Sequence, residues 1–384
     1  MKFGLSGYRV NRAGGLAVRR ISKASRPERD ERDRLEALAR KAEPALAKLI
    51  LEALKAHPGL VDLDALEEAI RRGNIEGALA ALNNDVLAGT YKTVARELSA
   101  IAWAAGSAVP ALTGTAFVFD HLNPALIDWL RSYTLGLIRE MNDQTLAGVR
   151  SALVRGMNAG TGPRETAREV RQVIGLTEYQ EKAVARFRSE LKGFHLRRSA
   201  KAWNLGGKID RAPGGAQVFK PDADGSPKDE VDARRLRDFR FDGTLKRAME
   251  KKVPLTQAQI DKMVDRYAER YRKHRAETIA RTESMRATNM GAFEAWKQAI
   301  LGGKVDQALV RRQWLTAKDE RLCQTCQPVP GMNPARGVKF DQPFQTPKGP
   351  VQIPPLHPNC RCSVFNRVWE PSQLVTTGGG GYKL

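Results

Sequence analysis

Two short cysteine motifs near the C-terminal end constrain this chain more than any other feature. Cys323 and Cys326 form a Cys-x-x-Cys turn, and residues 357–362 read His-Pro-Asn-Cys-Arg-Cys. The chain has 4 cysteines, and all of them lie in these motifs. A Cys-x-x-Cys turn holds two thiolates on one side of a tight knuckle, and a second turn with His and Cys can complete a tetrahedron around zinc. The sequence therefore predicts that the two turns meet in the folded protein.

The segment between the two motifs, residues 327–356, is rich in proline and glycine. It contains too few apolar side chains to bury a core of its own. A bound metal ion is the expected reason why such a segment holds a defined shape, because metal binding can supply the folding free energy that a small core lacks.

Five donors compete for four metal positions. We expect Cys323, Cys326, His357 and Cys360 to be the ligands, because His-x-x-Cys has the same spacing as the first pair. Cys362 is the alternative ligand, since it lies two residues beyond Cys360 and would face the same side of a strand. The predicted cofactor is zinc in a structural role.

The alternatives to a metal site are a disulfide pair and plain reduced thiols. Disulfide frameworks are typical of small secreted domains, whereas this chain is large, basic and without a secretory signal. A catalytic zinc ion keeps an open position beside a carboxylate or histidine base. No His-Glu-x-x-His motif or comparable acid lies near the five donors, so a catalytic site is not expected.

The charge of the chain favours a polyanionic partner. Its 384 residues include 64 Lys and Arg against 43 Asp and Glu, which gives a formal net charge of +21. No recognisable nucleic-acid-binding module is present, so we expect sequence-independent contact with a nucleic-acid backbone rather than base recognition. No run of purely apolar residues is long enough to span a bilayer, and therefore no membrane partner is expected.

Helical spacing of apolar residues dominates the chain and predicts a mainly α fold. Asn123 before Pro124, and the pairs Thr177 with Gln180 and Thr256 with Gln259, are capping signals that should begin helices. The stretch 106–119 contains glycine and proline and is predicted to be a linker. We expect a multi-helix body with one long helix, plus a small C-terminal zinc-clipped β element.

Changes in composition predict where the parts of the chain begin and end. The first residues are basic and poor in apolar side chains, residues 193–243 are polar and rich in turns, and the last residues are rich in glycine. The predicted parts are a basic flexible arm (1–25), an N-terminal helical region (26–115), a helical core (116–300) with a long polar excursion (193–243), a ribbon-like zinc module (301–371) and a flexible tail (372–384).

The longest helical pattern begins at Thr256 and reaches about Ile300, with Gly291 as the expected weak point. The middle of its apolar stripe is polar. Buried polar groups need partners, so these residues should hydrogen-bond to another segment, such as residues 314–319. The predicted structural polar cluster comprises Arg281, Thr282, Glu283, Asn289 and Asp319. The alternative is a catalytic acid at Glu283 acting with His274.

Two stretches that flank the cysteine motifs alternate apolar and polar residues. Val310 to Leu315 precedes the first motif, and Ser363 to Trp369 follows the second. Alternation of this kind predicts strands. We expect the two to pair antiparallel and form a small ribbon beside the metal.

Several short motifs, in this order and spacing, resemble the phage head-morphogenesis family, the minor capsid proteins similar to protein F of phage Mu. Together they span most of the chain from Phe119 to Trp369. The motifs are Asn123-Pro124-Ala125 with Trp129, Gly160 to Gly162, Ile174 to Thr177 with Gln180, Ile279 to Glu283 with Asn289, Trp314 to Asp319, and the two cysteine motifs.

The resemblance implies a protein without enzymatic activity inside the phage head, close to the portal. Its implied roles are procapsid assembly, DNA packaging or DNA ejection, and its implied partners are the portal protein, a scaffolding or major capsid protein, and packaged double-stranded DNA. Such a protein is made in the host bacterial cytoplasm. The alternative function is a zinc-dependent nuclease, or another DNA-processing enzyme, that uses His357 and a carboxylate.

Overall fold

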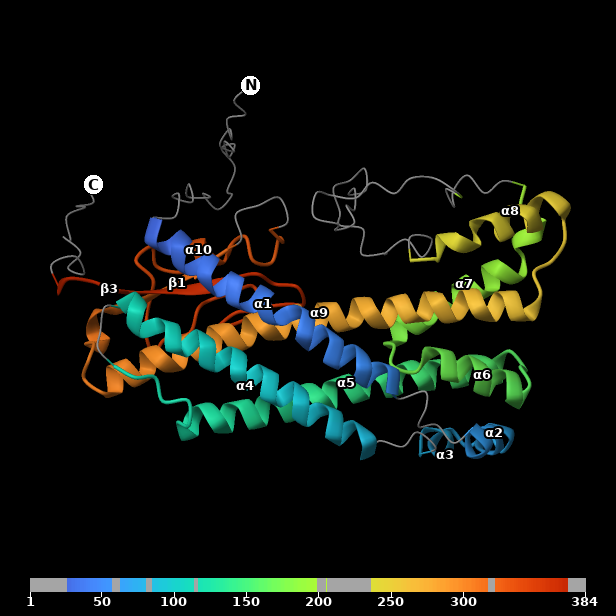
Figure 1. The fold of residues 1–384 in the computed structure, drawn as a ribbon, viewed down its shortest axis with the longest axis horizontal. Helices are drawn as coiled ribbons and strands as arrows, with labels where there is room; N and C mark the ends of the chain where they lie inside the picture. Colours follow the sequence, from blue (N-terminus) through green and yellow to red (C-terminus); the bar gives the residue numbers. More distant parts are fainter. Residues whose placement is uncertain are drawn as a thin grey trace, which may run out of the picture. The chain divides into compact units, whose positions relative to one another are not determined.

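The structure of the protein is a computed structural model (Figure 1). It describes residues 26–56, 63–80, 85–113, 117–198, 205, 236–316 and 322–371. The predicted arm, the predicted tail and most of the predicted polar excursion lie outside the described residues.

Helices make up most of the described chain, as the sequence predicts. Among them, α9 (Gln257–Leu301) runs unbroken through 45 residues and is the single long yellow-to-orange helix of Figure 1. The other helices are α1 (Arg26–Ala56), α2 (Leu63–Arg71), α3 (Ile75–Ala80), α4 (Asp85–Thr113), α5 (Pro124–Asn158), α6 (Pro163–Val173), α7 (Glu178–Lys192), α8 (Asp242–Lys251) and α10 (Val329–Met332). No helix in the described ranges is both long and apolar enough to cross a bilayer.

The predicted capping signals begin helices as expected. Thr177 and Gln180 form a reciprocal capping box at the start of α7. The Thr256 hydroxyl accepts from the backbone of Gln259 at 3.3 Å, and the Gln259 side chain accepts from the backbone of Thr256 at 2.9 Å. Asn123 caps α5 by accepting from the backbone of Ala125 at 3.0 Å. These bonds satisfy backbone N–H groups that have no partner within the helix.

The linker predicted over residues 106–119 is wrong for its first half, because α4 continues to Thr113. Gly106 lies inside the helix, where an added Cβ atom would be 2.3 Å from the ring of Phe119. Glycine therefore serves there to admit a bulky aromatic ring rather than to end the helix.

Gly291 is likewise a packing position and not a flaw in α9. A Cβ atom at this position would lie 1.9 Å from the carbonyl oxygen of Ala102 in α4. The missing side chain lets the backbones of the two helices approach more closely than any other residue would allow.

A three-stranded antiparallel sheet stands near the C-terminal end, in the order β2-β1-β3. The two predicted strands are β1 (Val310–Leu315) and β3 (Ser363–Val368), and they pair along their whole length. The third strand, β2 (Val338–Lys339), is too short to show an alternating pattern and was not predicted. The predicted fold class, mainly α with a small C-terminal β element, is confirmed.

The chain forms two compact units, each assembled from separate segments. The first comprises residues up to 47, residues 94–133 and residues from 278 onward, and the second comprises residues 48–93 and 134–277. An apolar core of the second unit includes Phe187 stacked on Tyr267, with ring centroids 4.3 Å apart. The predicted domain ranges are continuous in sequence, whereas these units are not, and the ranges stay a prediction.

Candidate metal centre

The first cysteine motif forms a tight knuckle in the loop that leads to α10. The backbone N–H of Cys326 donates to the sulfur of Cys323 at 3.2 Å and to its carbonyl oxygen at 3.2 Å. Turns of this kind direct both sulfur atoms to one side, and an N–H donor stabilises a thiolate.

The second motif forms a matching turn, in which Cys360 donates its backbone N–H to the carbonyl oxygen of His357 at 3.2 Å. Asn359 between them has a φ of 60°, a left-handed conformation that asparagine tolerates better than most residues. The Nδ1 atom of His357 lies 2.7 Å from the carbonyl oxygen of Pro358, so Nδ1 carries the proton and donates. In the neutral imidazole the lone pair is then on Nε2, the atom that metal-binding histidines use.

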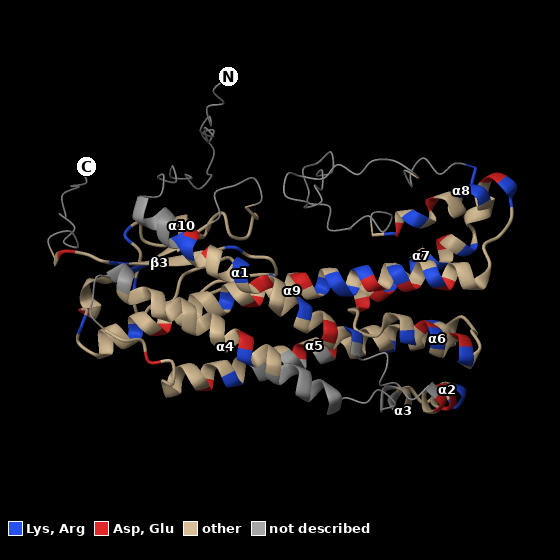
Figure 2. Ribbon diagram, in the orientation of Figure 1, with Lys and Arg blue, Asp and Glu red and all other residues tan. Residues whose placement is uncertain are grey.

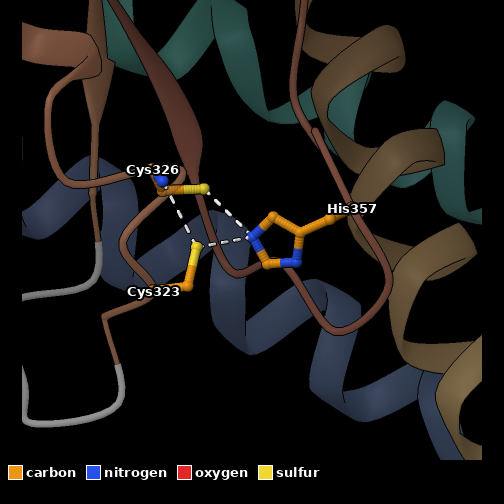
Figure 3. A group of neighbouring side chains, drawn as sticks. All are labelled: Cys323, Cys326 and His357. Carbon is orange, nitrogen blue, oxygen red and sulfur yellow. Dashed lines mark hydrogen bonds between the residues drawn. The ribbon is translucent and has the colours of Figure 1, made fainter. Parts of the chain in front are cut away.

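The two turns meet, and the ring of His357 points at both sulfur atoms of the first knuckle (Figure 3). Its Nε2 lies 2.8 Å from Cys323 Sγ and 3.1 Å from Cys326 Sγ. Cys326 Sγ in turn lies 3.7 Å from Cys360 Sγ. The donors form two groups, and within each group all ligand atoms lie within 4.8 Å of one another. The first group is Cys323, Cys326 and His357, and the second is Cys326, Cys360 and Cys362, so Cys326 belongs to both. This cluster can bind a metal ion.

The distances fit a tetrahedral ion with a small adjustment. Metal–sulfur bonds of about 2.3 Å place sulfur ligands about 3.8 Å apart, and the separation of Cys326 Sγ and Cys360 Sγ is 3.7 Å. The separations from His357 Nε2 are shorter than the roughly 3.5 Å that such an ion requires, so His357 would move outward by about half an ångström. All four cysteines are free thiols, so no disulfide joins the motifs.

The thiols and the imidazole perturb one another strongly. The hydrogen bond that Cys326 donates lowers the pKa of Cys360 far below its usual range and raises that of Cys326. A hydrogen bond with Cys360 raises the pKa of His357 to about 9. Burial raises the pKa of Cys323, but the hydrogen bonds from Cys326 and Thr325 and the charge of His357 together outweigh it, and the pKa falls. The lowered pKa values of Cys323 and Cys360 favour the thiolate form at these two residues, and thiolate is the form of cysteine that binds metals.

An apolar shell surrounds three of the five donors. Cys326, Cys360 and Cys362 are buried in a cluster with Trp314 and Phe344, whose rings meet edge to face at 5.2 Å. Val329, Val338 and Val364 complete this cluster. A shell of this kind keeps water away from bound metal and strengthens each electrostatic interaction within it.

The polar middle of α9 holds the second knuckle in place. The Thr282 hydroxyl accepts from the backbone N–H of Asn359 at 2.9 Å. The Asn289 side chain donates to the carbonyl oxygen of Cys362 at 3.3 Å and accepts from the backbone N–H of Val364 at 3.3 Å. Among the described residues, Thr282 and Asn289 thus contact the segment 359–364; the predicted partner segment, 314–319, lies partly outside the described residues and stays a prediction.

The other members of the predicted polar cluster have different surroundings. Glu283 is buried, accepts a hydrogen bond from the hydroxyl of Tyr133, and lies 3.5 Å from the guanidinium of Arg286. Arg281 is exposed and pairs with Glu43 at 2.8 Å. Asp319 lies outside the described residues. Thr282 and Asn289 thus contact one segment, 359–364, whereas Arg281 and Glu283 have other partners, and the cluster as a whole stays a prediction.

Residues 244–365 match the family model described as Phage Mu protein F like protein. This part of the chain is similar to the F-like family. The resemblance predicted from the motifs is confirmed for this range, which contains all five donors together with Thr282 and Asn289. No curated protein and no solved structure matches the chain.

The F-like region contains one organising residue that sequence reasoning missed. Arg312 on β1 is fully buried, and its guanidinium donates to the carbonyl oxygens of Gln342 at 2.5 Å and Gln352 at 3.0 Å. Three aromatic rings surround it, with centroids 5.0 to 5.6 Å away: Phe293, Phe340 and Phe344. Burial lowers its pKa to about 10. The sequence did contain a sign of this burial. Val310, Arg312 and Trp314 are spaced two residues apart, so they lie on the same face of the strand, and two of the three are apolar.

Arg312 changes the account of the proline-rich segment in the F-like region. The carbonyl oxygens of Gln342 and Gln352 both lie in this segment, and Arg312 binds them to the sheet. The segment therefore has a second anchor besides the metal cluster.

Proposed function

We propose that this protein is a minor component of a phage head and acts in head morphogenesis. One observation carries the proposal: the match of residues 244–365 to the Phage Mu protein F like family coincides with the part of the chain that contains the Cys/His cluster. The motifs over residues 123–180, which lie outside this range, support the same assignment.

The metal in this proposal is zinc. Thiolates and imidazole form the donor set that structural zinc sites use, and the proposed ligands are Cys323, Cys326, His357 and Cys360. Five donors for four positions favour a filled, closed tetrahedron. A catalytic zinc ion keeps one position open for water. Bound zinc would supply a crosslink between the two knuckles, and the role of the protein would be structural rather than enzymatic.

The proposed setting is the interior of the virion, after synthesis in the host bacterial cytoplasm. The proposed partners are the portal protein, a scaffolding or major capsid protein, and packaged double-stranded DNA. The net charge of +21 supports the contact with DNA, since Lys and Arg neutralise phosphates without reading sequence. Roles in DNA packaging or ejection would follow from this position.

The test is to purify procapsids and mature particles from the phage or prophage that encodes the chain, and to analyse both by mass spectrometry. We expect its peptides in both fractions, in fewer copies than the major capsid protein. A deletion mutant should yield heads that are defective in assembly or in DNA content. Absence of the chain from both fractions, with normal heads in the deletion mutant, would overturn the proposal.

A further inference from the structure

Three cations face one another directly across the small sheet. In the register of the strands, Arg311 of β1 stands opposite Lys339 of β2 on one side and opposite Arg367 of β3 on the other. Directly opposed residues project from the same face of a sheet. Like charges in this relation repel each other and destabilise the sheet, so a row of three has an energetic cost without an evident structural benefit.

This basic row, Lys339, Arg311 and Arg367, lies on the outer face of the sheet. Lys339 and Arg367 are exposed and Arg311 is half-buried. The opposite face of β1 carries Arg312 and Trp314, which are buried. The cationic groups of the row are therefore available to a partner.

No acidic side chain in the described part of the chain forms an ion pair with the basic row. Arg311 donates only to the carbonyl oxygens of Ala308 and Val310, both at 2.8 Å. The exposed part of α9 differs, since Lys and Arg there alternate with Asp and Glu (Figure 2). Arg266, for example, pairs with Glu269 at 2.7 Å. Several cations of α9 thus have acidic partners, and in the described part of the chain those of the row do not.

A fourth cation extends the row at its β3 end. The guanidinium of Arg367 lies 4.2 Å from the ring centroid of Trp369, and that of Arg336 lies 6.0 Å from the same centroid. Arg336 is exposed. Cation–π contacts of this kind restrain planar guanidinium groups and leave their N–H donors free for oxygen ligands.

We propose that the basic row, together with Arg336, binds the phosphate backbone of double-stranded DNA. The inference rests on the DNA contact of the proposed function and assigns that contact to a surface. The row crosses three neighbouring strands, which makes it about 10 Å long. A DNA duplex carries one phosphate charge about every 1.7 Å along its axis, so several phosphates lie within reach of the row. Protein interfaces, in contrast, centre on apolar and aromatic anchors, whereas the ring of Trp369 beside the row has two guanidinium groups next to it.

The test compares two triple variants of the full-length protein that lose the same charge. The first is Arg336→Gln, Lys339→Gln and Arg367→Gln, which spares the hydrogen-bonded Arg311. The matched control is Lys246→Gln, Lys262→Gln and Lys273→Gln, which removes three exposed lysines of α8 and α9. Binding to a fluorescent DNA duplex of mixed sequence is measured by anisotropy over a series of salt concentrations.

We expect the first variant to lose affinity for the duplex on the order of 10²-fold at about 0.1 M salt. The slope of log K against log salt should become shallower by about 2.7, because each of the three lost phosphate contacts contributes about 0.9 to it. The control should bind like the wild type. A third variant, Arg336→Lys with Arg367→Lys, should bind nearly normally because it retains the charges. Circular dichroism and thermal melts verify that all variants are folded.

Other outcomes would overturn the assignment in distinguishable ways. Equal losses in the first variant and the control would show that net charge alone governs binding. Unchanged binding by the first variant would place the DNA contact elsewhere. Binding to poly-glutamate but not to the duplex would identify an acidic protein as the partner. A wild-type protein that does not bind DNA would also refute the DNA contact of the proposed function, while detection in phage heads would still support the assembly role.

Discussion

At the scale of single residues, the F-like region depends on polar side chains that serve two segments at once. Asn289 lies on α9, yet both of its side-chain bonds to other segments go to the start of β3. Its amide is a donor and an acceptor at the same time, and the two backbone groups that it binds are a carbonyl oxygen and an N–H. A side chain with only one of these functions would leave a buried backbone group without a partner.

Asn289→Leu should therefore lower the free energy of unfolding by about 2 kcal/mol, since two buried backbone groups lose their partner. Urea denaturation followed by circular dichroism measures this change. Lys262→Leu, at an exposed position of the same helix, is the control and should change stability little. Equal stability of Asn289→Leu and the wild type would refute the role assigned to Asn289.

The buried guanidinium of Arg312 leads to a second residue-scale prediction. Arg312→Lys keeps a positive charge but cannot reach two carbonyl oxygens in one plane between aromatic rings. We expect it to destabilise the protein by about 2 to 3 kcal/mol, the range for hydrogen bonds to charged groups. The control is Arg311→Lys at the neighbouring, half-buried position of β1. It should lower the free energy of unfolding by less than about 1 kcal/mol, because surface substitutions usually change stability by about 0.5 kcal/mol or less. If the two variants melt alike, Arg312 is not an anchor.

At the scale of elements, the sequence predicts most helices and both long strands, but not how tightly they pack. Capping signals and apolar spacing are local, and they located the starts of α5, α7 and α9. Gly106 and Gly291 were misinterpreted because a glycine that admits a neighbouring backbone or ring looks the same in sequence as one that ends a helix. The two residues of β2 carry no periodicity. The donor spacing identified the candidate metal cluster, whereas the partners of Thr282 and Asn289 depend on tertiary contacts.

Gly291→Ala tests the close contact of α4 with α9. The added methyl group would overlap the carbonyl oxygen of Ala102, so the helices must separate, and overpacking of this kind destabilises by about 1 to 3 kcal/mol. Gly136→Ala in α5 is the matched control, because nothing lies within 4 Å of its added Cβ atom. It should stabilise the protein by about 0.4 to 1 kcal/mol. Thermal melts of the two variants should shift in opposite directions, and a shift in the same direction would contradict the packing described for Gly291.

Metal removal tests the cluster. We expect one zinc ion per chain by mass spectrometry, and a strong chelator should lower the melting temperature, which added zinc restores. Affinity should fall as the pH falls, because protons compete with the metal for thiolates and for the imidazole of His357. Cys326→Ala should lose the metal, whereas Cys362→Ala should retain it. A metal-free protein whose melting is insensitive to chelator would refute the zinc site.

At the scale of the whole molecule, the F-like match and the compact units follow different boundaries. Residues 244–365 begin in α8 and end in β3, but the first unit also needs residues up to 47 and residues 94–133. Those earlier segments supply the partners of α9 within that unit, including Ala102, Glu43 and Tyr133.

A fragment of residues 244–371 should therefore not fold by itself, even with zinc. We expect poorly dispersed amide signals in its nuclear magnetic resonance spectrum and no cooperative melt. The full-length protein under the same conditions provides the reference and should melt cooperatively. A fragment with dispersed signals and a sharp melt would show that the matched region is an independent domain.

The interleaving of the two units also sets an order of events on the ribosome. A chain emerges from its N-terminal end, and segments fold once their partners have been synthesised. The second unit is complete when residue 277 has emerged, whereas the first must wait for residues from 278 onward. The five metal donors are among the last of these, beginning with Cys323. The first unit can therefore fold only after the second unit has been synthesised, and its candidate metal donors can meet only at the end of that process.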